Sequence, residues 1–195
     1  MNRRALLASL ILVLAGCASQ QPLPNLSGSL SPRAGMAYVV VSLSSDDTQP
    51  SSTYLNARYT SATVQQGITM DFGRSIQTAL ANDRIGSGEG SVPGRVFLLE
   101  LEAGRYQFFE ANSHWPDAAG REPFSQSNRL VMQHSFDVAP GDTLYLGEIQ
   151  LNLSNRPQVN IIDAHERDFR VIRDEWKIND LSPLKVKLLQ ADSNK

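Results

Sequence analysis

The feature of this 195-residue sequence that most restricts its fold is a long apolar-polar alternation interrupted by one turn. Apolar residues and one His occupy every second position over residues 130–138, and the alternation resumes over 145–153. Residues 139–142, Ala-Pro-Gly-Asp, form a reverse-turn sequence because Pro presets the corner and Gly follows it. A period of two predicts two strands, each with one buried face. We expect the second strand to be the partner of the first and to place Tyr145 and Ile149 on one face.

Several other segments have strand character. A β-branched run covers residues 37–43, and apolar and polar residues alternate over 55–60 and again over 184–188. Residues 96–109 predict a hairpin that turns at 102–105. Val159 and Ile161 continue the pattern between the long alternation and the C-terminus.

One helix is expected near the C-terminus. Asp163 can cap its start, and Glu166 lies three residues later, as in a capping box. Phe169, Ile172 and Trp176 then fall on one face. This spacing predicts a helix that packs an aromatic stripe against a sheet.

Many short strands with Gly and Pro turns and a single late helix indicate a mainly β fold. We predict an antiparallel β-sandwich with one C-terminal helix, and a closed barrel is the main alternative. Residues 68–85 combine helix and strand signals and receive no assignment.

The N-terminal residues have the organisation of a secretory signal peptide. Arg3 and Arg4 precede an apolar run over residues 5–14, and the small residues Ala15 and Gly16 follow. Ten apolar residues span about 15 Å as a helix, half of a bilayer core of roughly 30 Å, so a membrane-spanning helix is disfavoured. We expect residues 1–16 to be removed.

Leu14-Ala15-Gly16-Cys17 resembles the lipobox of bacterial lipoproteins, in which the cysteine is lipidated. The resemblance implies that Cys17 carries the lipid. Ala18 occupies the position where Asp commonly signals inner-membrane retention in that family, so the resemblance implies an outer-membrane location in a Gram-negative host. Because Cys17 is the single cysteine, no intramolecular disulfide is expected.

Residues 17–35 are rich in Gln, Pro, Ser and Gly and predict a lipidated cysteine followed by a flexible tether. Residues 36–195 have the size of one domain, which we expect to be the β-sandwich.

Three segments of this domain have a further resemblance: Val96–Phe108, Phe136–Leu151 and Val159–Phe169. They resemble uncharacterised bacterial envelope lipoproteins with a prealbumin-like or carboxypeptidase-regulatory-like β-sandwich. The resemblance implies a fold and supplies no catalytic residue.

Charge and motifs narrow the function classes. The chain has 18 Lys and Arg against 20 Asp and Glu; without Arg3 and Arg4 the balance is 16 against 20, or −4. Without a cluster of basic residues, we expect no nucleic-acid partner. The sequence contains no G-x-S-x-G elbow, no H-E-x-x-H zinc helix and no P-loop, so we predict no catalytic residues and no cofactor.

The strongest candidate for binding is the segment Ala111–Phe124, which contains His114, Trp115 and Asp117. Its Pro and Gly content predicts a long loop, and loops on a rigid scaffold often bind ligands. Trp115 could stack on a sugar or on a partner's side chain. Alternatively, it folds back over one end of the sandwich, which is the favoured interpretation.

The other two histidines favour structural roles. His134 lies on the inward parity of its strand, where we expect a buried, hydrogen-bonded imidazole or a strand-end position. His165, Glu166 and Asp168 are close in sequence, but consecutive helical residues point in different directions, so we predict no metal site.

These features lead to an expected function. We predict an outer-membrane-anchored, non-enzymatic binding or assembly module of the cell envelope, with an envelope protein or glycan as partner. One alternative is an envelope enzyme that acts on cell wall or glycan through His114 or His134. A purely structural or stress-related envelope protein is a third, and the sequence does not distinguish it from the first.

Overall fold

The computed structural model establishes the arrangement of the domain. It describes residues 26, 28–45, 54–61, 74–79, 83–115, 126–152 and 157–192, with only the backbone at 54–61, 74–79, 112–115 and 126–129. The predicted signal peptide, Cys17 and Asp117 lie outside these residues. Within the described part of the chain, no helix combines the length and the apolar character needed to cross a bilayer.

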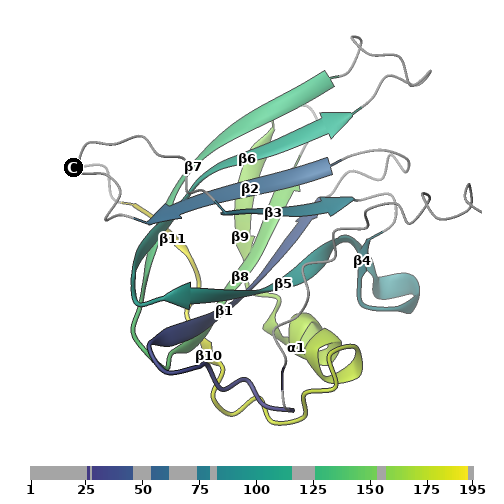
Figure 1. Cartoon of the computed structure of the whole chain (residues 1–195). Helices are drawn as coiled ribbons and strands as arrows, with labels where there is room; N and C mark the ends of the chain where they lie inside the picture. Colours follow the sequence, from purple (N-terminus) through teal and green to yellow (C-terminus); the bar gives the residue numbers. More distant parts are fainter. Residues whose placement is uncertain are drawn as a thin grey trace, which may run out of the picture.

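Two sheets form a β-sandwich, which confirms the predicted fold class (Figure 1). The helix-side sheet contains β1 (Met36–Ser45), β4 (Arg84–Ile85), β5 (Val92–Glu102), β8 (Thr143–Asn152), β9 (Gln158–Ile162) and β10 (Lys185–Val186). The outer sheet contains β2 (Tyr54–Ser61), β3 (Arg74–Ala79), β6 (Gly104–Trp115), β7 (Gln126–Val138) and β11 (Gln190–Ala191). Most pairs are antiparallel, but β8 is parallel to β1 and to β10.

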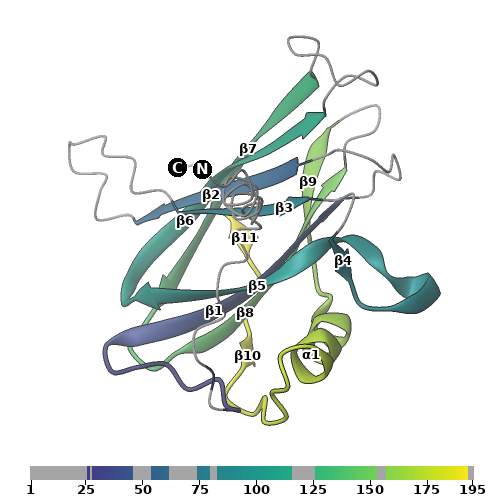
Figure 2. The same ribbon diagram turned by 45° about the vertical axis from the view of Figure 1, so that its right-hand side comes forward.

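The helix α1 (His165–Asp174) lies against the face of the helix-side sheet that points away from the outer sheet (Figures 1 and 2). As predicted, Phe169, Ile172 and Trp176 belong to the apolar cluster on this face. The ring of Phe169 meets that of Tyr145 edge-on at 5.4 Å between centroids. The domain therefore has three layers, with one core between the sheets and a second beneath α1.

Strand β1 is buried on both faces, which explains its β-branched run. Val39, Val41 and Leu43 belong to the core between the sheets, whereas Tyr38 and Val40 belong to the core under α1. A strand covered on both sides is expected to be continuously apolar instead of alternating.

The predicted pairing of the two strands around residues 139–142 is wrong. The turn is present, with Gly141 at a φ of +84°, but β7 joins the outer sheet and β8 crosses to the helix-side sheet. Tyr145 and Ile149 also lie on opposite faces of β8. A register shift against β1 coincides with Gly147, whose φ of +98° suits glycine, and the extra residue of this β-bulge reverses the side-chain parity.

The predicted capping box is also wrong in detail. The N-cap residue is Ala164, and no side chain caps the first turn. Asp163 instead accepts hydrogen bonds from the His165 backbone N–H at 3.3 Å and from the His165 ring at 2.7 Å. A carboxylate one residue before the N-cap bonds to the chain two residues on, as Asp does in turns.

The last part of the predicted tether is packed on the domain. Leu30 is fully buried in the cluster under α1, and its carbonyl accepts a hydrogen bond from Thr143 at 3.0 Å. Arg33 makes a bidentate pair with Glu100 at 2.7 and 2.8 Å. Residues 28–35 therefore differ from the expected flexible tether. Burial of the Leu30 side chain lowers the free energy of the packed segment relative to a solvated coil.

Candidate functional site

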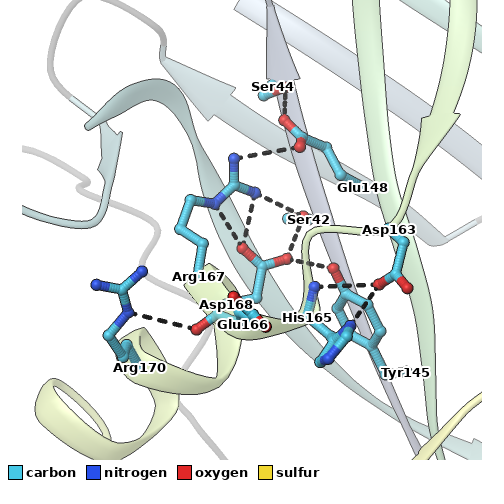
Figure 3. Close-up of polar contacts among 10 residues, drawn as sticks. All are labelled: Ser42, Ser44, Tyr145, Glu148, Asp163, His165, Glu166, Arg167, Asp168 and Arg170. Atoms are coloured by element: carbon cyan, nitrogen blue, oxygen red, sulfur yellow. Dashed lines mark hydrogen bonds and ion pairs between the residues drawn. The ribbon is translucent and has the colours of Figure 1, made fainter. Parts of the chain in front are cut away.

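The most concentrated polar chemistry in the described part of the chain lies between α1 and the helix-side sheet (Figure 3). We call it the buried polar cluster: Ser42 and Ser44 of β1, Tyr145 and Glu148 of β8, and Arg167 and Asp168 of α1. All of these residues except Arg167 are buried. Buried charges persist only when they are paired and hydrogen-bonded, so the contacts of each one determine what the cluster can do.

Asp168 is the centre of the cluster and is fully buried. Its Oδ2 accepts hydrogen bonds from the Ser42 hydroxyl at 2.6 Å and the Tyr145 hydroxyl at 2.7 Å. Its Oδ1 accepts from Nε and Nη2 of Arg167 at 2.8 and 2.7 Å. Four donors thus satisfy one carboxylate that has no access to water.

Glu148 provides the second carboxylate of the cluster. Its Oε1 accepts a short hydrogen bond from Ser44, and its Oε2 lies 3.1 Å from Nη1 of Arg167. Arg167 therefore uses all three of its nitrogens to bridge one carboxylate of the helix and one of the sheet. The planar guanidinium suits this role because its donors are fixed in a fork.

Local backbone geometry brings these residues together. Ser42 and Ser44 are two apart on β1 and therefore point to the same face, where Tyr145 also lies. The bulge at Gly147 pairs Glu148 with Ser42 instead of leaving it out of phase. A Cβ on Gly147 would lie 3.0 Å from the carbonyl oxygen of Ile162, so a side chain there is strained by position and by φ.

The charges and hydrogen bonds of the cluster are satisfied by its own members. Burial raises the pKa of Tyr145, and the neighbouring Asp168 raises it further, so the hydroxyl stays protonated and donates. Two carboxylates share one guanidinium, and every carboxylate oxygen has a donor. This arrangement joins α1 to the sheet; it leaves no carboxylate oxygen without a donor.

A polar hollow of about 340 Å³ borders the cluster through Arg167. Its lining comes from the β4–β5 turn and from α1: Gly86, Ser87, Gly90, Arg167, Arg170, Val171, Asp174 and Glu175. Ligand pockets of this size are usually lined by apolar side chains. The mixed charges here suit a hydrated surface hollow.

His134 lies where the sequence predicts it, on the inner face of β7 between Met132 and Phe136. Its Nδ1 is buried and has no hydrogen-bond partner within the described residues. Burial lowers the pKa of His134, and the charge of Asp192 partly opposes this. The Asp192 carboxylate is bonded to Gln107 and Ser135 instead.

The candidate binding residues are placed only by their backbones. His114 and Trp115 are the last two residues of β6, paired with Ser127 and Gln126 of β7. The sequence predicts a loop at these two residues, but they continue the strand because the pairing of β6 with β7 extends as far as Trp115 and Gln126. The remaining candidate, Asp117, lies in the connection outside the described residues.

His165 has a local role at the start of α1. Its ring bonds to Asp163, and that hydrogen bond lowers the pKa of the Asp163 carboxyl. Asp168 is directed into the buried polar cluster instead. The described residues contain no group of three or more His, Cys, Asp or Glu arranged to hold a metal.

Local sequence patterns predict almost none of the buried polar cluster. A signal was available in two Ser residues at the end of an apolar strand, together with an Arg-Asp pair in the first turn of an amphipathic helix. When a buried strand face and a buried helix face both carry polar residues, those residues are expected to contact one another, since an unpaired buried charge is costly. The bulge at Gly147, which turns Glu148 toward the helix, has no comparable sequence signal.

Comparisons with known proteins give no family for this chain. No family model matches it, and no curated protein matches it. A solved structure that matches is a leucine-rich repeat protein from Bacteroides thetaiotaomicron, 13% identical, with a TM-score of 0.29. The match covers 74% of this chain and only 16% of that chain, and at this score it supports no argument on fold or function.

Proposed function

We propose that this protein is an outer-membrane lipoprotein, anchored through Cys17, whose sandwich is a non-enzymatic binding or assembly module of the envelope. The observation that carries the proposal is the segment Leu14-Ala15-Gly16-Cys17, which follows a basic and then an apolar segment and contains the single cysteine. Charge, length, small residues and cysteine all agree with a lipobox. Ala18 favours the outer membrane over the inner one.

The lipid chemistry accounts for stable anchoring. One acyl chain contributes about 0.8 kcal/mol per buried methylene and holds a protein only marginally, whereas two or three chains on one cysteine hold it stably. The domain needs no membrane-spanning element for this arrangement.

Two features of the domain support a binding role. The buried polar cluster fixes α1 to the sheet, so the scaffold presents its surface with little rearrangement. The long β6–β7 ladder carries His114 and Trp115 to its end, next to the connection that contains Asp117. A Trp and polar side chains at the end of a rigid ladder suit an envelope protein or a glycan as ligand.

The test is crosslinking in cells at native abundance with Cys17 intact, followed by mass spectrometry of what copurifies. The proposal expects membrane association that Cys17→Ser abolishes, together with a reproducible protein or glycan partner. Membrane association that survives Cys17→Ser would refute the anchor, and the absence of any enriched partner would refute the binding module.

The alternative function is an envelope enzyme that acts on cell wall or glycan through His114 or His134. It predicts a hydrolytic activity that disappears in His114→Ala or His134→Ala while the fold survives. Activity that is absent from the parent chain, or unchanged in both variants, excludes this alternative.

A further inference from the structure

The N-terminal segment joins the domain at one defined place, which we call the base. Ser29 forms a β-bridge with Asp180, and Leu30 is buried in the cluster that contains Ile178, Leu181 and Leu184. Leu26 also packs against this cluster. The base therefore consists of residues 26 and 28–30 and the segment 178–184 that follows α1.

The base and the outer ends of the long strands lie on opposite sides of the molecule. Figures 1 and 2 show the start of the described chain below α1 and the helix-side sheet, whereas the end of β6 and the start of β7 are at the top in both views. The start of β9 at Gln158 also lies on the upper side. β6 alone has 12 residues, about 36 Å of extended strand.

The chain between the proposed anchor and the base is short. Cys17 and Leu26 are nine residues apart. Nine residues reach about 32 Å at full extension, and the coil expected from their composition averages about 17 Å. If the domain were turned over, its base would lie away from the lipid and this chain would have to extend well beyond its average length, which strongly restricts its conformations.

We infer that the domain stands on the membrane with its base toward the lipid and with the outer ends of β6, β7 and β9 directed away from it. This inference rests on the proposed lipid anchor at Cys17. It assigns the side that carries Gln158 and the end of the β6–β7 ladder to partners outside the membrane. The short connection to a buried Leu30 sets the orientation, and no lipid-binding patch is needed.

A pair of labelled variants tests the orientation. If Cys17 is lipidated, a new cysteine is the only free thiol, so Asn179→Cys and Gln158→Cys can each be labelled with a fluorophore on the full lipoprotein. Both positions are exposed, one at the base and one on the far side. Vesicles of phosphatidylethanolamine and phosphatidylglycerol with an acceptor dye on the headgroup then report the height of each label by energy transfer.

The expected result is roughly two-fold or greater transfer from position 179 than from position 158, because energy transfer falls steeply with distance and position 158 lies on the side of the molecule away from the base. Equal or greater transfer from position 158 would overturn the inferred orientation. An intact chain that does not float with the vesicles at all would instead overturn the lipid anchor, so the two failures are distinguishable.

A matched variant tests the cause of the orientation. Insertion of about 15 Gly and Ser residues after Asn25 should raise the fully extended length of the tether about 2.7-fold and its average length about 1.6-fold, and so reduce the difference between the two labels. A difference that persists unchanged would show that tether length does not set the orientation and would overturn this part of the inference.

Discussion

The two faces of the helix-side sheet are both buried, but different chemistry fills them. Toward the outer sheet, β1 contributes Val39, Val41 and Leu43 to a core made mostly of apolar side chains. Toward α1, the same strand contributes Tyr38 and Val40 and then changes to Ser42 and Ser44, which bind the carboxylates of the buried polar cluster. One strand therefore joins a dry interface and a charged one.

The two interfaces should respond differently to substitution. An apolar core loses stability in proportion to what is removed, because packing and burial are roughly additive over area. A buried charged cluster depends on all of its members, since each one that is removed leaves another group unpaired. Loss of one member of the cluster should therefore cost more than the contact area that it removes.

The largest effect should come from the apolar face. Leu43→Ala removes a fully buried side chain from the core between the sheets and should lower the free energy of unfolding by about 3–5 kcal/mol. Urea unfolding followed by circular dichroism measures it. Val131→Ala is the matched control, because Val131 is 75% exposed and its loss should change stability by less than about 0.5 kcal/mol. Similar losses in both variants would contradict the assigned core.

The polar face should come next. Arg167→Met keeps the aliphatic length but leaves Asp168 and Glu148 without their shared cation, so the free energy of unfolding should fall by about 3 kcal/mol. Removing one partner of a buried ion pair typically costs about 3–5 kcal/mol. We expect a loss near the lower value because the Arg167 side chain is 20% exposed, so water can partly replace its hydrogen bonds to the carboxylates. Its neighbour Arg170 is exposed and bonds only weakly to the Glu166 carbonyl at 3.4 Å. Arg170→Met should therefore be nearly neutral, and an equal loss would argue against the cluster.

A smaller change removes one donor from the cluster. Tyr145→Phe keeps the ring against Phe169 and deletes the hydroxyl that donates to Asp168, which should cost about 1–2 kcal/mol. When Tyr145→Phe is made in the Arg167→Met variant, the change in the free energy of unfolding should differ from that in the parent, because the Tyr145 hydroxyl and the Arg167 guanidinium both donate to Asp168. A double-mutant cycle by urea unfolding measures this coupling, and strictly additive losses would show that the two contacts are independent.

The sequence predicts the two faces unequally. The strand β1 is predicted by its continuous β-branched run and β7 by its apolar-polar alternation, because burial on two faces or on one face each leaves its own local pattern. The apolar stripe of α1 is predicted for the same reason. The partner of β8 and the orientation of Glu148 are not, since both depend on a crossover between sheets and on the bulge at Gly147. The buried polar cluster depends on pairings among residues 42 to 168, which local patterns do not encode.

The smallest effect concerns His134, the titratable residue of the apolar face. Burial lowers its pKa, so the folded state binds this proton less readily than the unfolded state does. The corresponding stability is complete above the unfolded pKa of about 6.5 and is lost as the pH falls through the lower pKa of the folded state. Between pH 7 and pH 5 the parent should therefore lose more stability than His134→Gln, by less than about 1 kcal/mol because the ring is only partly buried.

Urea unfolding of both chains at several pH values measures this difference. Asp192 is the acidic group that opposes the shift, and Asp192→Asn should increase the pH dependence of the parent while leaving that of His134→Gln almost unchanged. Asp192→Asn also weakens hydrogen bonds to Gln107 and Ser135, which lowers stability at every pH and leaves the slope as the informative quantity. Identical slopes for the parent and His134→Gln would show that His134 titrates alike in both states. Burial of His134 in the apolar face would then have no effect on its protonation. The difference between the apolar face and the buried polar cluster would then depend only on Leu43→Ala, Arg167→Met and Tyr145→Phe.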